Sequence, residues 1–502
     1  MKFDFKKGTF YRGQRIGLPK TFFSFVYKFF ANLIKCFECM NFLEKSGTVL
    51  LILMAVGLSG FKTYHSYAEA TQNVPAEGGE YTEAIVGEVK YLNPLIAQND
   101  AEKSISKLLF SGLVQIGDKN TIMADLAESW EISEDGKTYT FRLRKDSMFA
   151  DGGKLTATDI AYTVSSIQTP ELRSPLEKGF QNVEVEVLDD YTVVFTLPNA
   201  YGPFIYNCNF PVIPAHLTNA EFTKKITGSG PYMYVKSISS NDKLTELRLK
   251  KNPSYYGKKP LISDLKLKLY NSKDDAKAAF ESDDKTAALF GATSSLGRNL
   301  SFESSRQLAL IFNLRDDKLK DKSIREQIIS GQRIENAKFT MTTQDLPAQH
   351  EKAEFIKNQW RSNGMDLAVN YLTPVKYQEA VSAKNYELLL FGFDSGYDRD
   401  PYPYWHSSQM SAMNLSGWSD KNSDILLEDA RMLSDATERN EKYDQFFATV
   451  KSESLAVYFD PIDYNFSIKE LVKNVQPVIG DKAYSRYNSI ADWYIAEKRV
   501  KK

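Results

Sequence analysis

The stretch that decides the fold is LAESWEISEDGKTYTFRLRKDSMFADGGKLTATDIAYT, residues 126–163. Its middle part alternates apolar and polar side chains over residues 138–144, which predicts a half-buried β-strand. Further on, Thr156 and Asp159 form the pattern of a capping box, which marks the start of a helix. The apolar residues that follow share one helical face: Ile160, Val164 and Ile167. A strand followed closely by an amphipathic helix indicates a mixed α/β fold.

More strands and helices are predicted on the C-terminal side of this stretch. Residues 182–188 and 191–197 form two alternating runs around Asp189 and Asp190, which predicts a β-hairpin. Further strands are predicted at 265–270, 308–314 and 387–393, and helices at 273–281, 349–362 and 422–434. The strands at 308–314 and 387–393 are almost continuously apolar, as expected where helices cover both faces of a sheet. The pattern predicts an α/β protein with more than one sheet.

Composition excludes several classes of protein. The 502 residues exceed one small domain and suggest two or three lobes. The chain has 63 Lys and Arg against 64 Asp and Glu, so no nucleic-acid partner is indicated. Three cysteines are too few for a disulfide-stapled scaffold or a cysteine-rich zinc module. The hydrophobic fraction of 42% and the charged fraction of 25% are ordinary for a globular protein, which excludes bulk disorder.

The N-terminal part has a different charge balance from the rest. Residues 1–45 contain nine basic and three acidic residues, and the uncharged apolar run 46–61 follows them. This predicts a cytoplasmic basic segment at 1–45, a transmembrane signal anchor at 46–61 and a linker at 62–80, with the remainder outside the cytoplasm. Two alternatives remain for the run. The first alternative is a signal peptide that is cleaved after Ala70, and the second is a buried core helix.

A series of motifs then carries a specific resemblance. The motifs are Gly87 before Leu92-Asn93-Pro94, the stretch 126–163, GSGPY at 228–232 and KNPSYY at 251–256. In this order they resemble family 5 of the bacterial extracellular solute-binding proteins, the oligopeptide- and dipeptide-binding components of ABC importers. The resemblance covers roughly residues 82–270. It is looser at 310–328, 400–409 and 414–431.

The resemblance implies a two-lobed, periplasmic-binding-protein-like clamp of class II, enlarged by an extra subdomain and preceded by one transmembrane helix. Lobe I with its subdomain is expected at 81–270, a trimmed lobe II at 271–474 and a return to lobe I at 475–502. The hinge is expected near 268–272 and again near 470–485. Binding of a ligand in the cleft between the lobes would close the clamp.

The implied function is capture of oligopeptides outside the cytoplasm and their delivery to the permease subunits of an ABC importer. The protein is expected to be a monomer without enzymatic activity, cofactor or metal. The alternatives are a sugar or metal chelate as ligand, or a clamp reused as a membrane-anchored receptor. An enzyme is disfavoured because the four histidines are scattered and no P-loop or nucleophile-elbow motif occurs in a suitable context.

The resemblance also suggests where a peptide's amine is held. The family pattern is a Gly-Trp pair, an Asp that binds the ligand amine, then an acidic residue and Pro. Gly392-Phe393 and Asp400-Pro401 match its two ends, with one extra residue between them. The position of the amine-binding Asp falls on Gly396 or Tyr397. The role therefore passes to the neighbouring carboxylates, Asp394 or Asp398, with Asp398 preferred.

The candidate ligand-binding residues are Glu88, Tyr91, Gly392, Phe393, Asp394, Asp398, Trp405 and His406. Each set has a structural alternative. The acidic residues around 394–400 are also consistent with a solvated loop or a calcium-type oxygen cluster. Glu88 and Tyr91 are either cleft-lining residues or strand-edge surface. Trp405 and His406 are either ligand contacts or packing residues.

Overall fold

The computed structural model describes residues 28, 31–32, 35–117, 120–334 and 337–502. Contacts divide the chain into two compact units, residues 1–74 with 498–502, and residues 75–497. Each unit is described by itself below. Most of the predicted basic segment 1–45 lies outside the described residues.

The first unit contains a long apolar helix. Helix α2 runs from Phe42 to Ala70 and begins at a capping box between Asn41 and Glu44. An 18-residue window of the helix has a mean hydropathy of 1.5, so by length and composition the helix could cross a membrane, and none of its residues is buried. The helix includes the predicted span 46–61 but continues through residues predicted as linker. No Gly or Pro interrupts residues 62–70, so nothing local ends the helix there. Strands β1 (Thr71–Pro75) and β20 (Glu497–Lys501) then form a two-stranded sheet.

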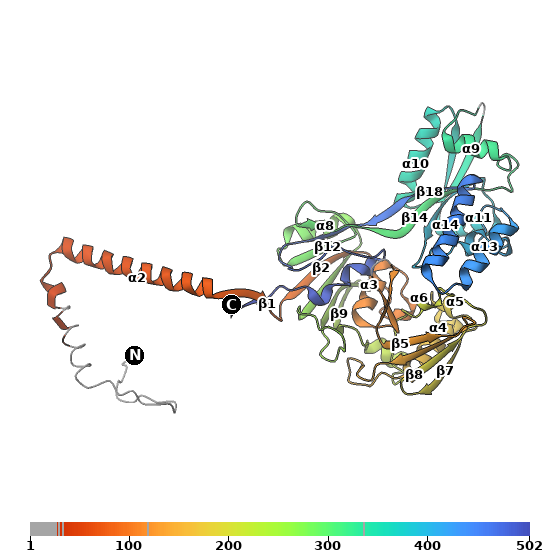
Figure 1. The fold of residues 1–502 in the computed structure, drawn as a ribbon. Coiled ribbons are helices and arrows are strands. Elements are labelled where there is room, and N and C mark those ends of the chain that lie inside the picture. The colour runs from red at the N-terminus through yellow and green to blue at the C-terminus, as the bar shows by residue number, and fades with distance from the viewer. Residues whose placement is uncertain (1–27, 29–30, 33–34, 118–119, 335–336) are drawn as a thin grey trace. The chain divides into compact units, whose positions relative to one another are not determined.

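The second unit has two lobes (Figure 1). Lobe I, residues 75–300 and 465–497, is built on a seven-stranded sheet. Its strands, in spatial order, are β13 (Arg298–Asn299), β19 (Phe466–Ile468), β12 (Thr286–Phe290), β2 (Glu80–Val86), β11 (Asp264–Tyr270), β10 (Lys243–Lys251) and β9 (Tyr232–Ser240). Strand β2 pairs in parallel with β11 and with β12. The strand predicted at 265–270 is confirmed as β11.

The extra subdomain of lobe I is the part coloured orange to yellow in Figure 1. Its sheet has the order β5 (Ala127–Ile132), β6 (Thr138–Leu143), β8 (Thr192–Thr196) and β7 (Glu184–Asp189). The predicted strand, hairpin and helix of this region are confirmed as β6, β7–β8 and α4 (Ala157–Gln168). The remaining elements of lobe I are β3 (Val114–Ile116), β4 (Ile122–Ala124), α3 (Asp100–Leu109), α5 (Glu177–Phe180), α6 (Phe204–Asn207), α7 (Asn219–Lys224) and α8 (Lys273–Ser282).

Lobe II, residues 302–464, has a five-stranded sheet. Its order is β16 (Asp366–Leu372), β15 (Lys338–Gln344), β17 (Leu388–Asp394), β14 (Phe302–Phe312) and β18 (Ala456–Tyr464). Its helices are α9 (Lys322–Ser330), α10 (Pro347–Ser362), α11 (Pro374–Ala383), α12 (Tyr402–Trp405), α13 (Lys421–Met432) and α14 (Ala436–Ser452). Leu308 and Leu310 of β14 pack in one core with Trp360 of α10, whereas Ala309 packs in a second core with Phe446 of α14. The predicted burial of this apolar strand on both faces is confirmed.

The crossings between the lobes correct the predicted hinge. Helix α8 and strands β12 and β13 still belong to lobe I, so the first crossing lies near residues 300–305 rather than 268–272. The chain returns between β18 and β19, near residue 465, rather than at 470–485. The physical reason is that β12 continues the parallel sheet beside β2, which apolar periodicity alone does not assign to a lobe.

Candidate ligand-binding site

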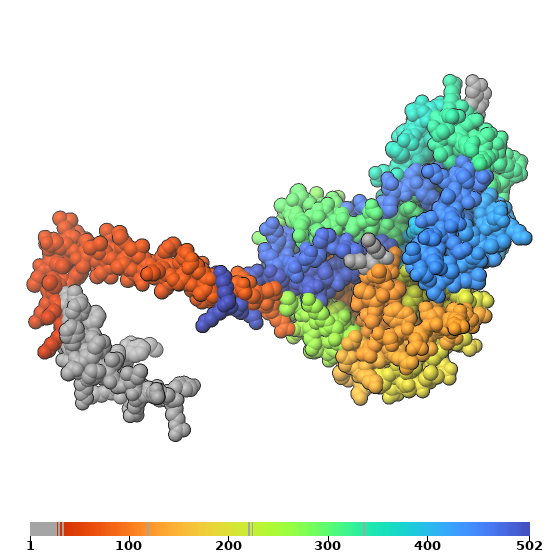
Figure 2. Space-filling model, viewed as in Figure 1, coloured from red at the N-terminus to blue at the C-terminus, as the bar shows by residue number. Residues whose placement is uncertain are grey.

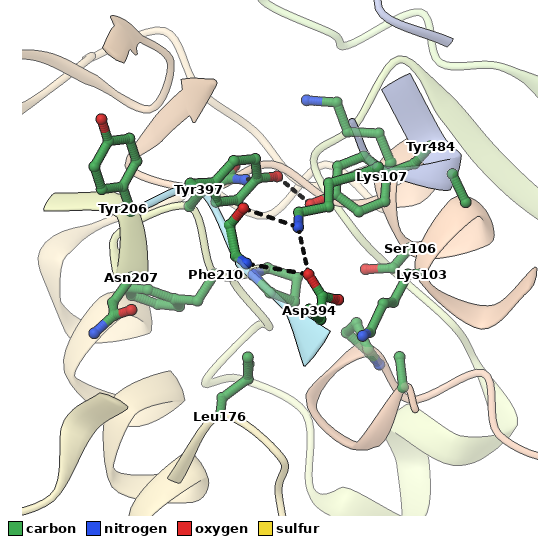
Figure 3. Close-up of a pocket in the computed structure, with 18 of the residues that line it drawn as sticks. Lys103, Ser106, Lys107, Leu176, Tyr206, Asn207, Phe210, Asp394, Tyr397 and Tyr484 are labelled. Carbon is green, nitrogen blue, oxygen red and sulfur yellow. Dashed lines mark hydrogen bonds and ion pairs between the residues drawn. The ribbon is translucent and has the colours of Figure 1, made fainter. Parts of the chain in front are cut away.

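A cavity of about 430 Å³ lies between the lobes. Lobe I contributes one face of α3 and the loop 201–211, and lobe II contributes the segment 394–398 after β17. Figure 3 shows the side chains that line it, and Figure 2 shows the blue surface of lobe II meeting the orange and yellow surface of lobe I. The volume falls within the range of roughly 300–1,000 Å³ typical of small-molecule pockets.

Helix α3 forms one wall of the cavity. Gly228 and Gly230, just before strand β9, let the C-terminal end of this helix approach closely. Asp100, Lys103 and Lys107 lie on its cavity face, spaced by about one helical turn. Gly230 donates its N–H to the carbonyl of Leu109 at 2.9 Å, and a Cβ there would lie 2.6 Å from the Leu109 carbonyl carbon. The GSGPY motif therefore positions the helix that carries the cavity cations.

Glu102 connects α3 to the segment where Glu88 and Tyr91 were predicted to meet ligand. Its carboxylate is buried and accepts N–H bonds from Lys90 at 2.9 Å and Gln98 at 2.8 Å. The side chains of that segment point elsewhere. Glu88 pairs with Lys243 at 3.5 Å, and Tyr91 is 46% exposed. Neither residue lines the cavity.

An ion pair joins the two lobes at the N-terminus of α3. The guanidinium of Arg306, on β14, donates two hydrogen bonds to Asp100, at 2.8 and 2.6 Å. Tyr464 donates its hydroxyl to the same carboxylate at 3.3 Å. A bidentate pair of this kind fixes both the distance and the orientation of its two groups. It therefore holds the two lobes rigidly on either side of the cavity.

Asp394 makes a second contact between the lobes. It accepts hydrogen bonds from Lys482 of lobe I at 2.9 Å and from the Ser305 hydroxyl at 2.6 Å. Burial alone would raise the pKa of Asp394, but Lys482 and these hydrogen bonds outweigh it, so the pKa lies well below its usual range. The carboxylate is ionised at neutral pH, and its hydrogen bonds are made through Oδ1.

This pKa shift predicts an acid-dependent loss of stability. A carboxylate with a lowered pKa stabilises the fold above its unfolded pKa of about 3.9, and this contribution disappears as the pH falls towards the folded pKa. We therefore expect Asp394→Asn to lower the free energy of unfolding at neutral pH and to have a diminishing effect in acid. Urea unfolding of both proteins over a pH series measures this. A difference that is constant across the series would contradict the assignment.

Asp398 lies on the lobe II side of the cavity and is bound internally. It accepts hydrogen bonds from the buried Arg439 at 2.6 Å and from the Tyr443 hydroxyl at 2.9 Å. Burial raises the pKa of Asp398 although Arg439 and Tyr443 oppose the shift. The next carboxylate, Asp400, pairs with Arg431 at 2.7 Å. Each acidic residue of this segment is thus paired with a cation of the chain. From the sequence we expected an amine site, a solvated loop or a calcium-type oxygen cluster, and none of these includes such pairs.

These contacts predict a structural effect for Asp398→Asn. The change leaves the Arg439 charge buried without its carboxylate, while hydrogen bonds to the carbonyls of Leu433 and Ser434 remain. We expect a loss of about 1–3 kcal/mol in the free energy of unfolding. Thermal unfolding of the variant measures the effect. Unchanged stability together with weaker ligand binding would instead restore Asp398 as a ligand contact.

Tyr397 extends across the cavity from lobe II to lobe I. Its ring stacks on Tyr206, with centroids 5.9 Å apart and an interplanar angle of 19°. Its hydroxyl hydrogen-bonds that of Tyr484, and its backbone carbonyl accepts from Asn120 at 3.0 Å. Figure 3 shows Tyr397 between Tyr206 and Tyr484. Tyr397 is thus the central side chain of the cavity wall.

The remaining predicted residues lie within lobe II rather than at the cavity. Phe393 is buried in the core of lobe II, 4.8 Å from the ring of Tyr404. Trp405 is also buried there and donates to the Tyr458 hydroxyl at 3.2 Å. His406 is buried, with Nε2 3.1 Å from Glu428. Gly392 is in β17, paired with Leu308.

Sequence reasoning missed several residues that line the cavity. They are Lys103, Lys107, Tyr206, Arg306, Lys482 and Tyr484. No sequence pattern marked these residues as cavity residues, because basic residues on an amphipathic helix are ordinarily solvated. The tyrosine content of 28 residues indicated aromatic ligand surfaces without locating them.

Comparison with known proteins agrees with this geometry. The family model described as "Bacterial extracellular solute-binding proteins, family 5 Middle" matches residues 121–331. The oligopeptide-binding protein AppA of Bacillus subtilis is 21% identical over 495 residues, which covers 80% of this chain and 90% of AppA.

Two solved structures share the fold. The ABC transporter substrate-binding protein CtaP of Listeria monocytogenes superposes with a TM-score of 0.71 at 21% identity, covering 83% of this chain and 99% of CtaP. AppA of Bacillus subtilis, in complex with a nonapeptide, gives a TM-score of 0.63 at 18% identity, covering 84% of this chain and 100% of AppA. The fold, the motif order and the family match over residues 121–331 agree, and in all three the chain is similar to family 5 of the bacterial extracellular solute-binding proteins.

Proposed function

We propose that this protein captures short oligopeptides between its two lobes and delivers them to an ABC importer. The observation that carries the proposal is the cavity of about 430 Å³ between the two lobes of a family 5 clamp. The oligopeptide-binding relative AppA, which aligns with 80% of this chain, supports peptides as the ligand class. The volume favours short peptides over long ones.

The cavity wall has the chemistry that a peptide of variable sequence requires. Aromatic rings of Tyr206, Phe210 and Tyr397 offer stacking surfaces, and the hydroxyl of Ser106 and the Oδ1 of Asn207, whose Nδ2 donates to Gly179, face the peptide backbone. A ligand bound mainly through its backbone leaves its side chains in wet, tolerant spaces. Such recognition fits a carrier that hands its cargo on unaltered.

The α2 helix gives the proposal its location. We infer that α2 anchors the protein in the membrane, with residues 75–497 outside the cytoplasm, next to the permease. The excess of basic residues before the helix favours this orientation. Cell fractionation and protease shaving of intact cells test it: the large unit should be membrane-bound and accessible to protease.

Native mass spectrometry of the full chain in detergent tests the ligand class. The protein is incubated with mixed tri- to pentapeptides, and bound masses are read directly. We expect peptides to be retained, and calorimetry with a retained peptide should give saturable heat without any change in the peptide. Retention of only a sugar or a metal chelate, or cleavage of the peptide, would overturn the proposed function.

A further inference from the structure

We propose that the cavity selects peptides whose N-terminal amine is uncharged, such as N-acylated peptides, over peptides with a free ammonium. This inference rests on the proposed function and concerns only which peptides the site accepts. It is carried by the pairing of every carboxylate in the cavity wall and by the place of Tyr397 between the lobes.

Each carboxylate that lines the described part of the cavity already binds a cation of the chain. Asp100 accepts two hydrogen bonds from Arg306, Asp394 accepts from Lys482, and Asp398 accepts from Arg439. An ammonium that approached one of these carboxylates would have to share it with the cation already bound there. Two cations that share one carboxylate repel each other, and this repulsion offsets what the new pair contributes.

The side chains that line the cavity carry more positive than negative charge, and an ammonium is positive too. Four cationic side chains line the cavity, namely Lys103, Lys107, Arg306 and Lys482, against three carboxylates. Within the described part of the chain, Lys103 makes no recorded ion pair or hydrogen bond. A second positive charge brought in on the peptide is therefore disfavoured, and an amide-capped end is not.

Tyr397 shapes the part of the wall between Asp394 and Asp398. Its ring lies on Tyr206 and its hydroxyl meets Tyr484, so this stretch presents aromatic carbon and neutral hydroxyl groups. Such a surface suits an acyl cap, whose carbonyl accepts a hydrogen bond and whose carbon atoms pack on the rings. It gives an ammonium no ionic partner.

Asp481 is the strongest rival as an amine partner. Its Oδ1 is buried without a hydrogen-bond partner among the described residues, 3.9 Å from Lys482. The residue does not line the cavity, and burial raises the pKa of its carboxyl group, which favours the neutral form. It serves as a control site in the experiment.

The test compares a mixed tetrapeptide library with the same library after N-acetylation, in competition for the full chain, by native mass spectrometry. We expect the acetylated peptides to be retained about threefold or more over the free ones. Equal retention of the two libraries, or a preference for the free library, overturns this inference while the proposed function stands. Retention of neither library overturns the proposed function itself.

Two variants locate the effect. Tyr397→Asp adds a carboxylate without a dedicated cation, and we expect it to shift the preference about tenfold towards free amines. Tyr397→Asn, of the same size as Asp but uncharged, controls for loss of the ring and should not create a preference for free amines. Asp481→Asn should also leave it unchanged. No shift in Tyr397→Asp, or an amine preference that disappears in Asp481→Asn, overturns the inference.

Discussion

Glu83→Gln is expected to cost about 3–5 kcal/mol in the free energy of unfolding, because it leaves a buried arginine without its counter-ion. Glu83 lies in the centre of β2, and its carboxylate is 2.8 Å from Nε of Arg486, with both side chains fully buried. Tyr81 and Tyr487 donate their hydroxyls to the other oxygen of Glu83 at 2.8 Å. The glutamine amide cannot accept from both tyrosines and also neutralise the guanidinium.

The effect should be local to lobe I. Arg486 also donates to the Ser104 hydroxyl at 2.8 Å, which connects the return segment to α3. Hydrogen exchange of β2 and α3 amides, together with urea unfolding, measures the loss. The control is Glu131→Gln, which removes an exposed ion pair with Arg142 at 3.5 Å and should cost less than about 1 kcal/mol. An equal loss of unfolding free energy in the two variants would show that the buried ion pair stabilises the fold no more than the exposed one.

The sequence predicted the elements of the fold well where a local pattern decides them. Alternation gave β6 and the β7–β8 hairpin, and continuous apolar character gave β14 and β17 with both faces covered. The lobe boundary was wrong because it depends on which strands become neighbours. Strand β12 pairs with β2, which lies far away in the sequence, and apolar periodicity gives no information about such pairings.

The site was harder to predict for a related reason. Asp394 and Asp398 do lie at the cavity, since the strand β17 that precedes them was identified. Their partners Lys482 and Arg439 come from segments far along the chain, so the sequence could not show that both charges are already paired. Trp405 and His406 instead follow their structural alternative, because α12 turns them into lobe II.

The extra residue in the 392–401 segment illustrates the limit of motif alignment. Against the family pattern it left the amine-binding position on Gly396 or Tyr397. Gly396 has a φ of 65°, a backbone conformation that glycine adopts without strain, and the next residue is thereby directed at lobe I. Tyr397, one of the two residues at the position of the amine-binding Asp, is the side chain that spans the cavity.

Gly202→Ala is expected to weaken ligand binding about 10- to 100-fold while each lobe stays folded. Gly202 belongs to the lobe I loop before α6, and its N–H donates to the carbonyl of Arg431 in lobe II at 2.8 Å. A Cβ on Gly202 would collide with the backbone carbonyl oxygen of Leu433. Because a backbone atom cannot rotate away as a side chain does, the lobes must separate at this point.

The loss follows from the population of the ligand-binding state. An overpacked contact costs about 1–3 kcal/mol, and the apparent affinity falls with the fraction of molecules that can close. Calorimetry with a retained peptide measures the affinity, and small-angle X-ray scattering measures separation of the lobes. Gly392→Ala is the matched control, because its Cβ would make an ordinary 3.7 Å contact with Leu308 inside lobe II. If both variants bind peptide equally well, the Gly202 contact does not take part in closure, and the contacts of Arg306, Lys482 and Tyr397 hold the lobes around the ligand without it.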